Sequence, residues 1–153
     1  MSEKTSGNKT PKDELDIVND EEILYRRIPV RPEYYNPEVD ARPSLRAFEP
    51  IRHDTTGLSV FREKLTTPEE AARGQLGKPY YVAVLLTRQL RERGIEVVPR
   101  PLDGKPGHAE LPGITYDTRH SREVRDREAQ LAEELCLEIL GPFSPPASES
   151  ALC

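Results

Sequence analysis

Prolines set the strongest limit on how this chain folds. Fifteen of the 153 residues are proline, which is about twice the usual share. Proline removes a backbone donor, so it interrupts helices and central strands. Residues 31–44 contain Pro32, Pro37 and Pro43 and are predicted to be an irregular surface loop. We therefore expect short strands and helices joined by proline-rich loops.

Composition and charge narrow the class of protein. A chain of 153 residues with 35% hydrophobic and 32% charged residues suits one domain with a modest core. The net charge of −5 provides no general attraction to nucleic acid or to an anionic membrane. Neither a leader nor a long apolar run is evident, so a cytoplasmic protein without membrane contact is expected. Cys136 and Cys153 are predicted to be reduced thiols.

The domain organisation follows from the polar ends. Residues 1–20 and 144–153 are polar and are predicted to be disordered tails. Residues 21–143 are predicted to form a single domain. A protein partner would bind through the loops or the tails, and a nucleic acid is an improbable partner.

Local patterns predict the elements of that domain. The capping box Thr67–Glu70 with Pro68 starts a helix that Gly74 ends. A second helix is expected over 87–94, capped by Thr87 and ended by Gly94, and a third from Ser121. Strands are expected at 21–30, 58–61, 79–86, 95–99, 108–111 and from about Leu135, with a brief extended piece at 45–51. Strands and short helices without regular alternation predict an α+β fold with a small mixed or antiparallel sheet.

Several kinds of chemistry find no motif here. The three histidines lack a close-spaced pair and the two cysteines are far apart, which disfavours a metal centre. The phosphate-binding loop of nucleoside triphosphatases is missing, and Ser59 does not lie in a nucleophile elbow. No metal is therefore expected.

Polar residues in extended segments are the candidate site. In residues 52–62, Asp54 is near enough to orient His53, and Ser59 opens a strand. His108 and Glu110 lie two apart on a strand and so share one face, where they suit a general base and an orienting group. The alternative is the solvent face of an edge strand. Gly107 permits close backbone approach.

Two further sets of side chains suggest contacts with a ligand. Arg26 and Arg27 point to opposite faces of their strand, and the buried one needs a carboxylate such as Asp54 or Glu110, or an anionic ligand. The alternative is an edge strand with an outward guanidinium. Four aromatic residues either stack on a nicotinamide or nucleobase or pin the proline-rich loop to the core. They are Tyr34, Tyr35, Phe48 and Phe61.

Three segments carry a resemblance to known proteins. LYRR (24–27), GLSV (57–60) and PGHAEL (106–111) resemble a group of small bacterial cytosolic proteins that supplies no activity. The order of arginine, serine and glutamate is also similar to the R-S-E type of ADP-ribosyltransferase. That resemblance implies that Arg26 or Arg27 grips a phosphate of NAD, Ser59 shapes the nicotinamide pocket and Glu110 stabilises the ribosyl cation. Leu58 and Val60 around Ser59, and His108 two residues before Glu110, depart from the family's usual pattern.

Three functions are compatible with these residues. The first is a small interaction or accessory module with a protein partner and no cofactor, which we prefer from the sequence. The second is an NAD-using transfer or NAD-cleaving enzyme, with Arg26, Arg27 and Ser59 at the cofactor. The third is a metal-independent ribonuclease that uses His53 or His108. The observation that separates them is whether these side chains gather in one place.

Overall fold

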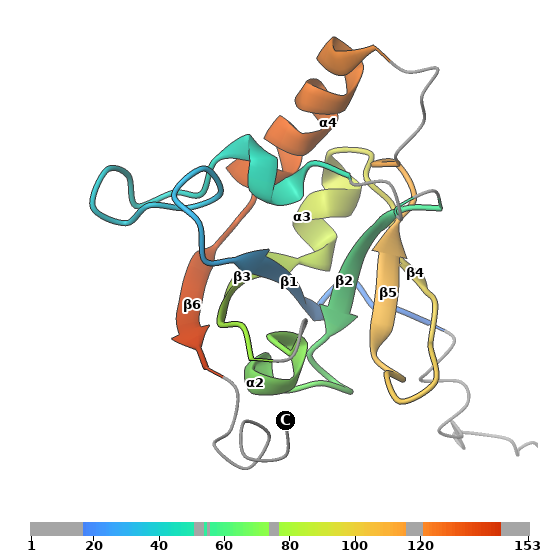
Figure 1. The fold of residues 1–153 in the computed structure, drawn as a ribbon. Helices are drawn as coiled ribbons and strands as arrows, with labels where there is room; N and C mark the ends of the chain where they lie inside the picture. The colour runs from blue at the N-terminus through green and yellow to red at the C-terminus, as the bar shows by residue number, and fades with distance from the viewer. Residues whose placement is uncertain (1–16, 51–53, 55, 74–76, 116–120, 145–153) are drawn as a thin grey trace, which may run out of the picture.

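The described residues form one six-stranded antiparallel sheet. The computed structural model describes residues 17–50, 54, 56–73, 77–115 and 121–144. The strand order is β4-β5-β2-β1-β3-β6, so β1 and β2 lie in the middle (Figure 1). The α+β prediction is confirmed. The strands are β1 (Ile23–Pro29), β2 (Leu58–Arg62), β3 (Tyr80–Leu86), β4 (Val98–Pro99), β5 (His108–Leu111) and β6 (Glu138–Phe143).

Short helices cover the two faces of the sheet unequally. They are η1 (Leu45–Phe48), α2 (Pro68–Ala71), α3 (Thr87–Glu92) and α4 (Arg122–Glu134). In Figure 1, α4 lies at the top of the molecule and α2 at the bottom. Side chains of η1, α3 and α4 share one hydrophobic cluster, whereas α2 contributes to a second cluster.

Strand alternation assigns each cluster to one face. The face that we call the helical face carries Leu24 and Ile28 of β1 with Leu58 and Val60 of β2, packed against Phe48. The opposite face, which we call the α2 face, carries the smaller cluster, which comprises Tyr25, Phe61, Ala71, Ala72, Tyr80, Val82 and Val84. The core also takes in Val18, which is buried, so packing reaches slightly beyond the expected start at residue 21.

Most predicted elements occur, with three differences. The Thr67–Glu70 capping box is present with Pro68 in the first turn, and Gly94 has a φ of +82° after α3. The prediction of an extended piece at 45–51 is wrong, because Leu45–Phe48 is a 3₁₀ helix capped by Ser44. Only Val98–Pro99 of the strand expected at 95–99 pairs. Thr87 does not cap α3, since its hydroxyl donates to the Glu22 carbonyl at 2.8 Å.

Candidate functional site

Polar side chains from β2 and β5 lie side by side on the α2 face. The antiparallel register pairs Ser59 with Glu110 and Phe61 with His108. All four residues alternate with core residues of the helical face, so their side chains point to the α2 face. His108 and Glu110 thus share a face, as expected. β5 is not an edge strand, because β4 pairs with it, and His108 is buried at 6% exposure.

A hydrogen bond joins Ser59 to His108 across the two strands. His108 Nε2 lies 3.1 Å from Ser59 Oγ, and Nδ1 lies 2.8 Å from the Arg100 carbonyl oxygen. A carbonyl only accepts, so Nδ1 carries the proton in this arrangement. In the neutral ring Nε2 then accepts from the Ser59 hydroxyl. This is the arrangement in which a base sits against a hydroxyl and a third group orients the base.

Glu110 is held at the edge of the same group. Its Oε1 accepts from Thr56 Oγ1 at 2.8 Å and lies 3.3 Å from Arg100 Nε. The Glu110 side chain is 12% exposed, whereas Arg100 is 55% exposed. One carboxylate oxygen, Oε1, is therefore held by two donors. Neither Thr56 nor Arg100 was a sequence candidate, because nothing in their local pattern marks them as partners of Glu110.

Arg26 lies on the helical face and has a structural environment. Its Nε donates to the Ala47 carbonyl and its Nη1 to the Ser59 carbonyl, both at 3.0 Å. Burial lowers the pKa of Arg26 to about 10, and the nearby carboxylate of Asp54 partly offsets this. β1 is a central strand, so the alternative of an edge-strand arginine is wrong. Arg26 is separated by the sheet from the Ser59 and Glu110 side chains.

Arg27 lies on the α2 face with the other candidates. Its guanidinium carbon is 5.4 Å from the ring centroid of Phe61 and 5.5 Å from that of Tyr80. Its Nη1 donates to the Arg73 carbonyl at 2.7 Å and to the Ala71 carbonyl at 3.4 Å, just after α2. Burial lowers the pKa of this guanidinium.

Phe61 connects Arg27 to the polar group. The Phe61 ring contacts the Arg27 guanidinium. It also packs edge-on against the His108 ring, with the two ring centroids 5.6 Å apart. The β1–β2 pairing joins Tyr25 to Phe61, and alternation along β1 puts Arg27 on the same face as Tyr25. Arg27, Ser59 and Glu110 therefore lie on one face of β1, β2 and β5, and Ser59 pairs directly with Glu110.

A pocket of about 160 Å³ opens beside Phe61. Its wall includes the cationic side chains of Arg73 and Lys105 and the hydroxyl of Thr66. Gly107 lies against this wall, where an added Cβ would meet Thr66 Oγ1 at 2.1 Å. The close backbone approach expected at Gly107 is therefore present, and its partner is the segment after β2.

Two of the three histidines, His53 and His120, lie outside the residues that the structure describes. Within the described ranges no group of three potential metal ligands occurs. None of the helices described here has the length and apolar character to cross a bilayer. Cys136 is a free, buried thiol.

Sequence reasoning missed a buried ion pair at the end of β2. Arg62 Nε lies 2.6 Å from Glu22 Oε2, and both side chains are at most 1% exposed. Arg62 Nη2 also donates to the Ile17 carbonyl at 2.8 Å. The pair ties the segment before β1 to the end of β2. No sequence signal marked it, since Glu22 lies in an ordinary acidic run.

Comparison with family models, with curated proteins and with solved structures finds no match for the chain. The chemistry of the site has to be argued from its own residues.

Proposed function

We propose that the chain binds NAD on the α2 face and cleaves or transfers its ADP-ribosyl group. The observation that carries this proposal is that Arg27, Ser59 and Glu110 come from three neighbouring strands and lie on one face of the sheet, with Ser59 paired to Glu110. The resemblance to the R-S-E type of ADP-ribosyltransferase requires these three residue types in this order. Arg27, and not Arg26, has the matching position.

The reaction breaks the glycosidic bond between the ribose C1′ and the nicotinamide nitrogen. The bonding electrons leave with nicotinamide, and positive charge develops on the ribose. A fixed carboxylate such as Glu110 stabilises that charge, because preorganised groups act where charge develops. Water or an acceptor side chain then bonds to C1′ and loses a proton.

Neighbouring groups suit the rest of the ligand. Glu110 keeps its orientation through Thr56 and Arg100. The pocket beside Phe61 offers an aromatic wall for a flat ring, and it is lined by the cations of Arg73 and Lys105, which suit phosphate oxygens, together with the carboxylate of Glu70. Ser59, whose hydroxyl lies 3.1 Å from His108 Nε2, pairs across the strands with Glu110.

The test measures binding and turnover separately. Calorimetric titration with NAD reports binding, and chromatography of released nicotinamide reports cleavage. Glu110→Gln is expected to keep NAD affinity within a few-fold and to lose about 100-fold or more in turnover. Arg27→Lys is expected to weaken NAD binding. Glu123→Gln in the first turn of α4, an exposed carboxylate on a helix that packs on the helical face, is the control and is expected to behave as wild type. No heat with NAD, or equal turnover in Glu110→Gln, would reject the proposal.

A binding module without catalysis is the second candidate. What favours it is a hydrophobic surface around the proline-rich loop, where Val39 is 80% exposed. The ribonuclease hypothesis has less support, because both ring nitrogens of His108 have partners within the chain. Its test is RNA cleavage by the His108→Ala variant, in which intact cleavage would remove this histidine from the mechanism.

A further inference from the structure

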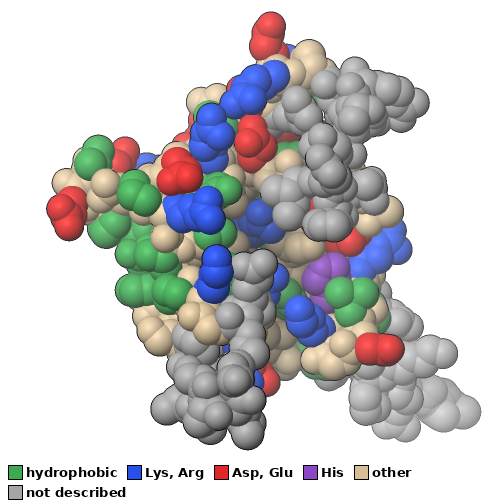
Figure 2. Space-filling model, in the orientation of Figure 1, with side chains coloured by type: hydrophobic (Ala, Val, Ile, Leu, Met, Phe, Trp, Pro, Cys, Tyr) green, Lys and Arg blue, Asp and Glu red, His purple; other side chains and the backbone are tan. Residues whose placement is uncertain are grey.

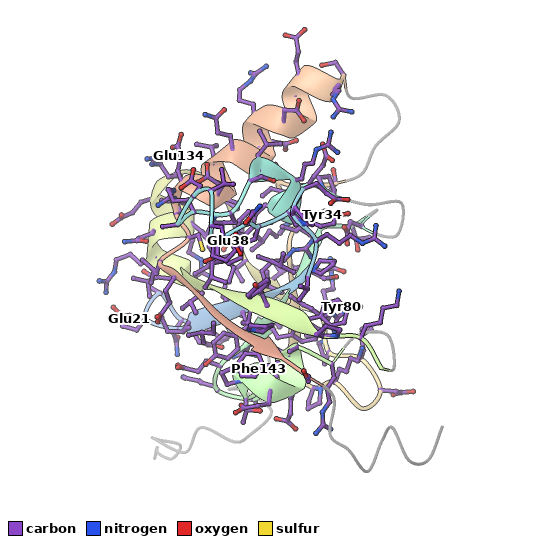
Figure 3. The ribbon with its side chains drawn as sticks, turned by 60° about the vertical axis from the view of Figure 1, so that its left-hand side comes forward. Glu21, Tyr34, Glu38, Tyr80, Glu134 and Phe143 are labelled. Carbon is purple, nitrogen blue, oxygen red and sulfur yellow. The ribbon has the colours of Figure 1, made fainter. Side chains whose placement is uncertain are left out.

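Two hollows lie side by side where β1 ends and β3 begins. Each has a volume of about 320 Å³, and they share Val30 and Arg31 as a common wall. The first is lined by Tyr34 and Tyr80, which Figure 3 labels on the same side of the molecule. The second is lined by Tyr35 and Tyr81, and prolines complete both linings, namely Pro29 and Pro79 in the first, Pro32 and Pro37 in the second.

The loop that builds these hollows is held in shape by its own hydrogen bonds. The backbone N–H groups of Tyr34 and Tyr35 donate to the Arg31 carbonyl at 3.0 and 3.1 Å. Ser44 returns to the start of the loop, donating from its N–H to the Tyr34 carbonyl at 2.9 Å and from its hydroxyl to the Glu33 carbonyl at 2.7 Å. A preformed surface loses less conformational entropy on binding.

Tyrosine packing extends this order into the sheet. The Tyr35 ring meets the Tyr81 ring edge-on at 90°, with centroids 4.9 Å apart. Tyr80 and Tyr81 are consecutive in β3, so their side chains leave opposite faces of the strand. The two hollows therefore flank the end of the sheet, and a linear segment that crosses Val30 reaches both.

Two valines of this segment leave apolar surface exposed. Val30 is 41% exposed and Val39 is 80% exposed. Figure 2 shows hydrophobic side chains gathered over the side of the molecule where Figure 1 draws this loop. Exposed apolar patches of this kind are typical of interaction sites.

Charge and shape indicate the chemistry of the occupant. Arg31 and Lys78 bring positive charge to the first hollow, whereas Glu38 lines the second, so the acidic group of a ligand is favoured at the first hollow. Tyrosine-lined hollows in series are the usual receptor for proline residues in an extended polyproline II segment, whose conformation is already restricted before binding.

We propose that this surface, the tyrosine–proline surface, binds an extended segment of a partner protein that contains prolines next to acidic residues. The inference rests on the binding role named above as the second candidate and is independent of the NAD proposal. The two tyrosine hollows take the proline rings, and Arg31 and Lys78 face the acidic residue.

The experiment titrates the full chain into a fluorescein-labelled peptide, Glu-Pro-Pro-Leu-Pro-Pro-Glu, and follows fluorescence polarisation. Saturable binding in the micromolar range is expected. Tyr34→Ala and Tyr81→Ala are each expected to weaken binding at least tenfold. Lys78→Glu is expected to weaken binding of this peptide, and binding should recover when the glutamates of the peptide are replaced by lysine. Leu137→Ala removes an exposed apolar side chain elsewhere and is expected to leave binding unchanged. Circular dichroism melts verify that each variant folds.

Other outcomes overturn the inference in distinguishable ways. An equally tight complex with a peptide whose prolines are replaced by alanine would retain a binding surface but remove its proline specificity. No saturation with any peptide would remove the surface itself. Preferential binding of a peptide that covers residues 144–153 would assign the surface to this chain's own end instead of a partner. Glu110→Gln is expected to bind the proline peptide as wild type does, which separates this result from that of the NAD test.

Discussion

Arg26 and Arg27 are consecutive in β1, yet their guanidinium groups lie on opposite faces of the sheet. Arg26 donates to the Ala47 and Ser59 carbonyls on the helical face, and Arg27 lies over Phe61 and Tyr80 on the α2 face. The same motif therefore provides one residue that links η1 to β2 and another that borders the candidate site. Of the two arginines, only Arg27 lies on the face that carries the Ser59 and Glu110 side chains.

Substitution of the two arginines should separate these roles. Arg26→Met leaves two buried carbonyls without their donor and is expected to lower the free energy of unfolding by about 2–4 kcal/mol. Arg27→Met is expected to cost less, about 1–2 kcal/mol, because its contacts are partly exposed. Urea denaturation monitored by circular dichroism measures both. Equal losses would contradict the assignment of Arg26 to a structural role.

The Ser59–His108 pair makes a spectroscopic prediction. Because Nδ1 faces the Arg100 carbonyl at 2.8 Å, the neutral imidazole should carry its proton on Nδ1 and leave Nε2 as an acceptor. Two-bond ¹H–¹⁵N spectra at high pH distinguish the two tautomers. Ser59→Ala is the matched variant, since it removes the hydroxyl and retains the carbonyl contact, and should shift Nε2 more than Nδ1. A proton on Nε2 in the wild-type chain would reverse the donor and acceptor roles.

The buried pair of Glu22 and Arg62 should behave unlike an exposed pair. Arg62→Met leaves a buried carboxylate without its partner and is expected to cost about 3–5 kcal/mol of unfolding free energy. The double variant Glu22→Leu/Arg62→Met should recover much of that loss. Arg93→Met, which breaks the exposed contact with Glu134 at 3.5 Å, is the control and should cost about 1 kcal/mol or less. Chemical denaturation of the four proteins measures these differences, and similar costs for both pairs would disprove the contrast.

Two glycines provide a paired test of the packing beside β5. An alanine Cβ at Gly107 would meet Thr66 Oγ1 at 2.1 Å and Leu65 Cβ at 3.2 Å, whereas nothing lies within 4 Å of a Cβ at Gly113. Gly107→Ala is therefore expected to destabilise the fold by about 1–3 kcal/mol through overpacking. Gly113→Ala should change stability by about 0.5 kcal/mol or less. Thermal unfolding compares them, and a neutral Gly107→Ala variant would mean that the Thr66 segment yields freely.

Local signals were sufficient for most of the fold. Residues 79–86 were predicted to be a strand covered on both faces. β3 contributes Ala83 and Leu85 to the cluster of the helical face, and Val82 and Val84 to that of the α2 face. The Thr67–Glu70 capping box started α2 as expected because both of its hydrogen bonds lie within four residues. The prediction of an extended piece at 45–51 was wrong because Ser44 caps a 3₁₀ helix there. The prediction that Thr87 caps α3 was wrong because its hydroxyl donates a hydrogen bond to the carbonyl of Glu22, which is distant in the sequence.

The candidate site could be anticipated only in part, because it depends on pairing between strands. Alternation alone placed His108 and Glu110 on one face, but the register that sets Ser59 beside Glu110 is a tertiary property. The sequence left open which of Arg26 and Arg27 shares that face. The partners Thr56 and Arg100 come from segments whose proximity to Glu110 appears only once β4, β5 and β2 are aligned.

The buried thiol of Cys136 is expected to make the free energy of unfolding fall as the pH rises in the alkaline range. Burial raises the pKa of this thiol to about 11, whereas an unfolded cysteine ionises near a pKa of about 8.5. Between these values the unfolded chain binds fewer protons than the folded one, so stability is lost as the pH rises. Urea unfolding at pH 7.5, 9 and 10 should show a larger decline for the wild-type chain than for Cys136→Ala. In a Cys153→Ser background, iodoacetamide should alkylate Cys136 slowly at pH 8.5 until urea unfolds the chain. A parallel pH dependence in both proteins, or rapid alkylation of the folded chain, would show that the thiol is accessible and ionises as an ordinary cysteine does.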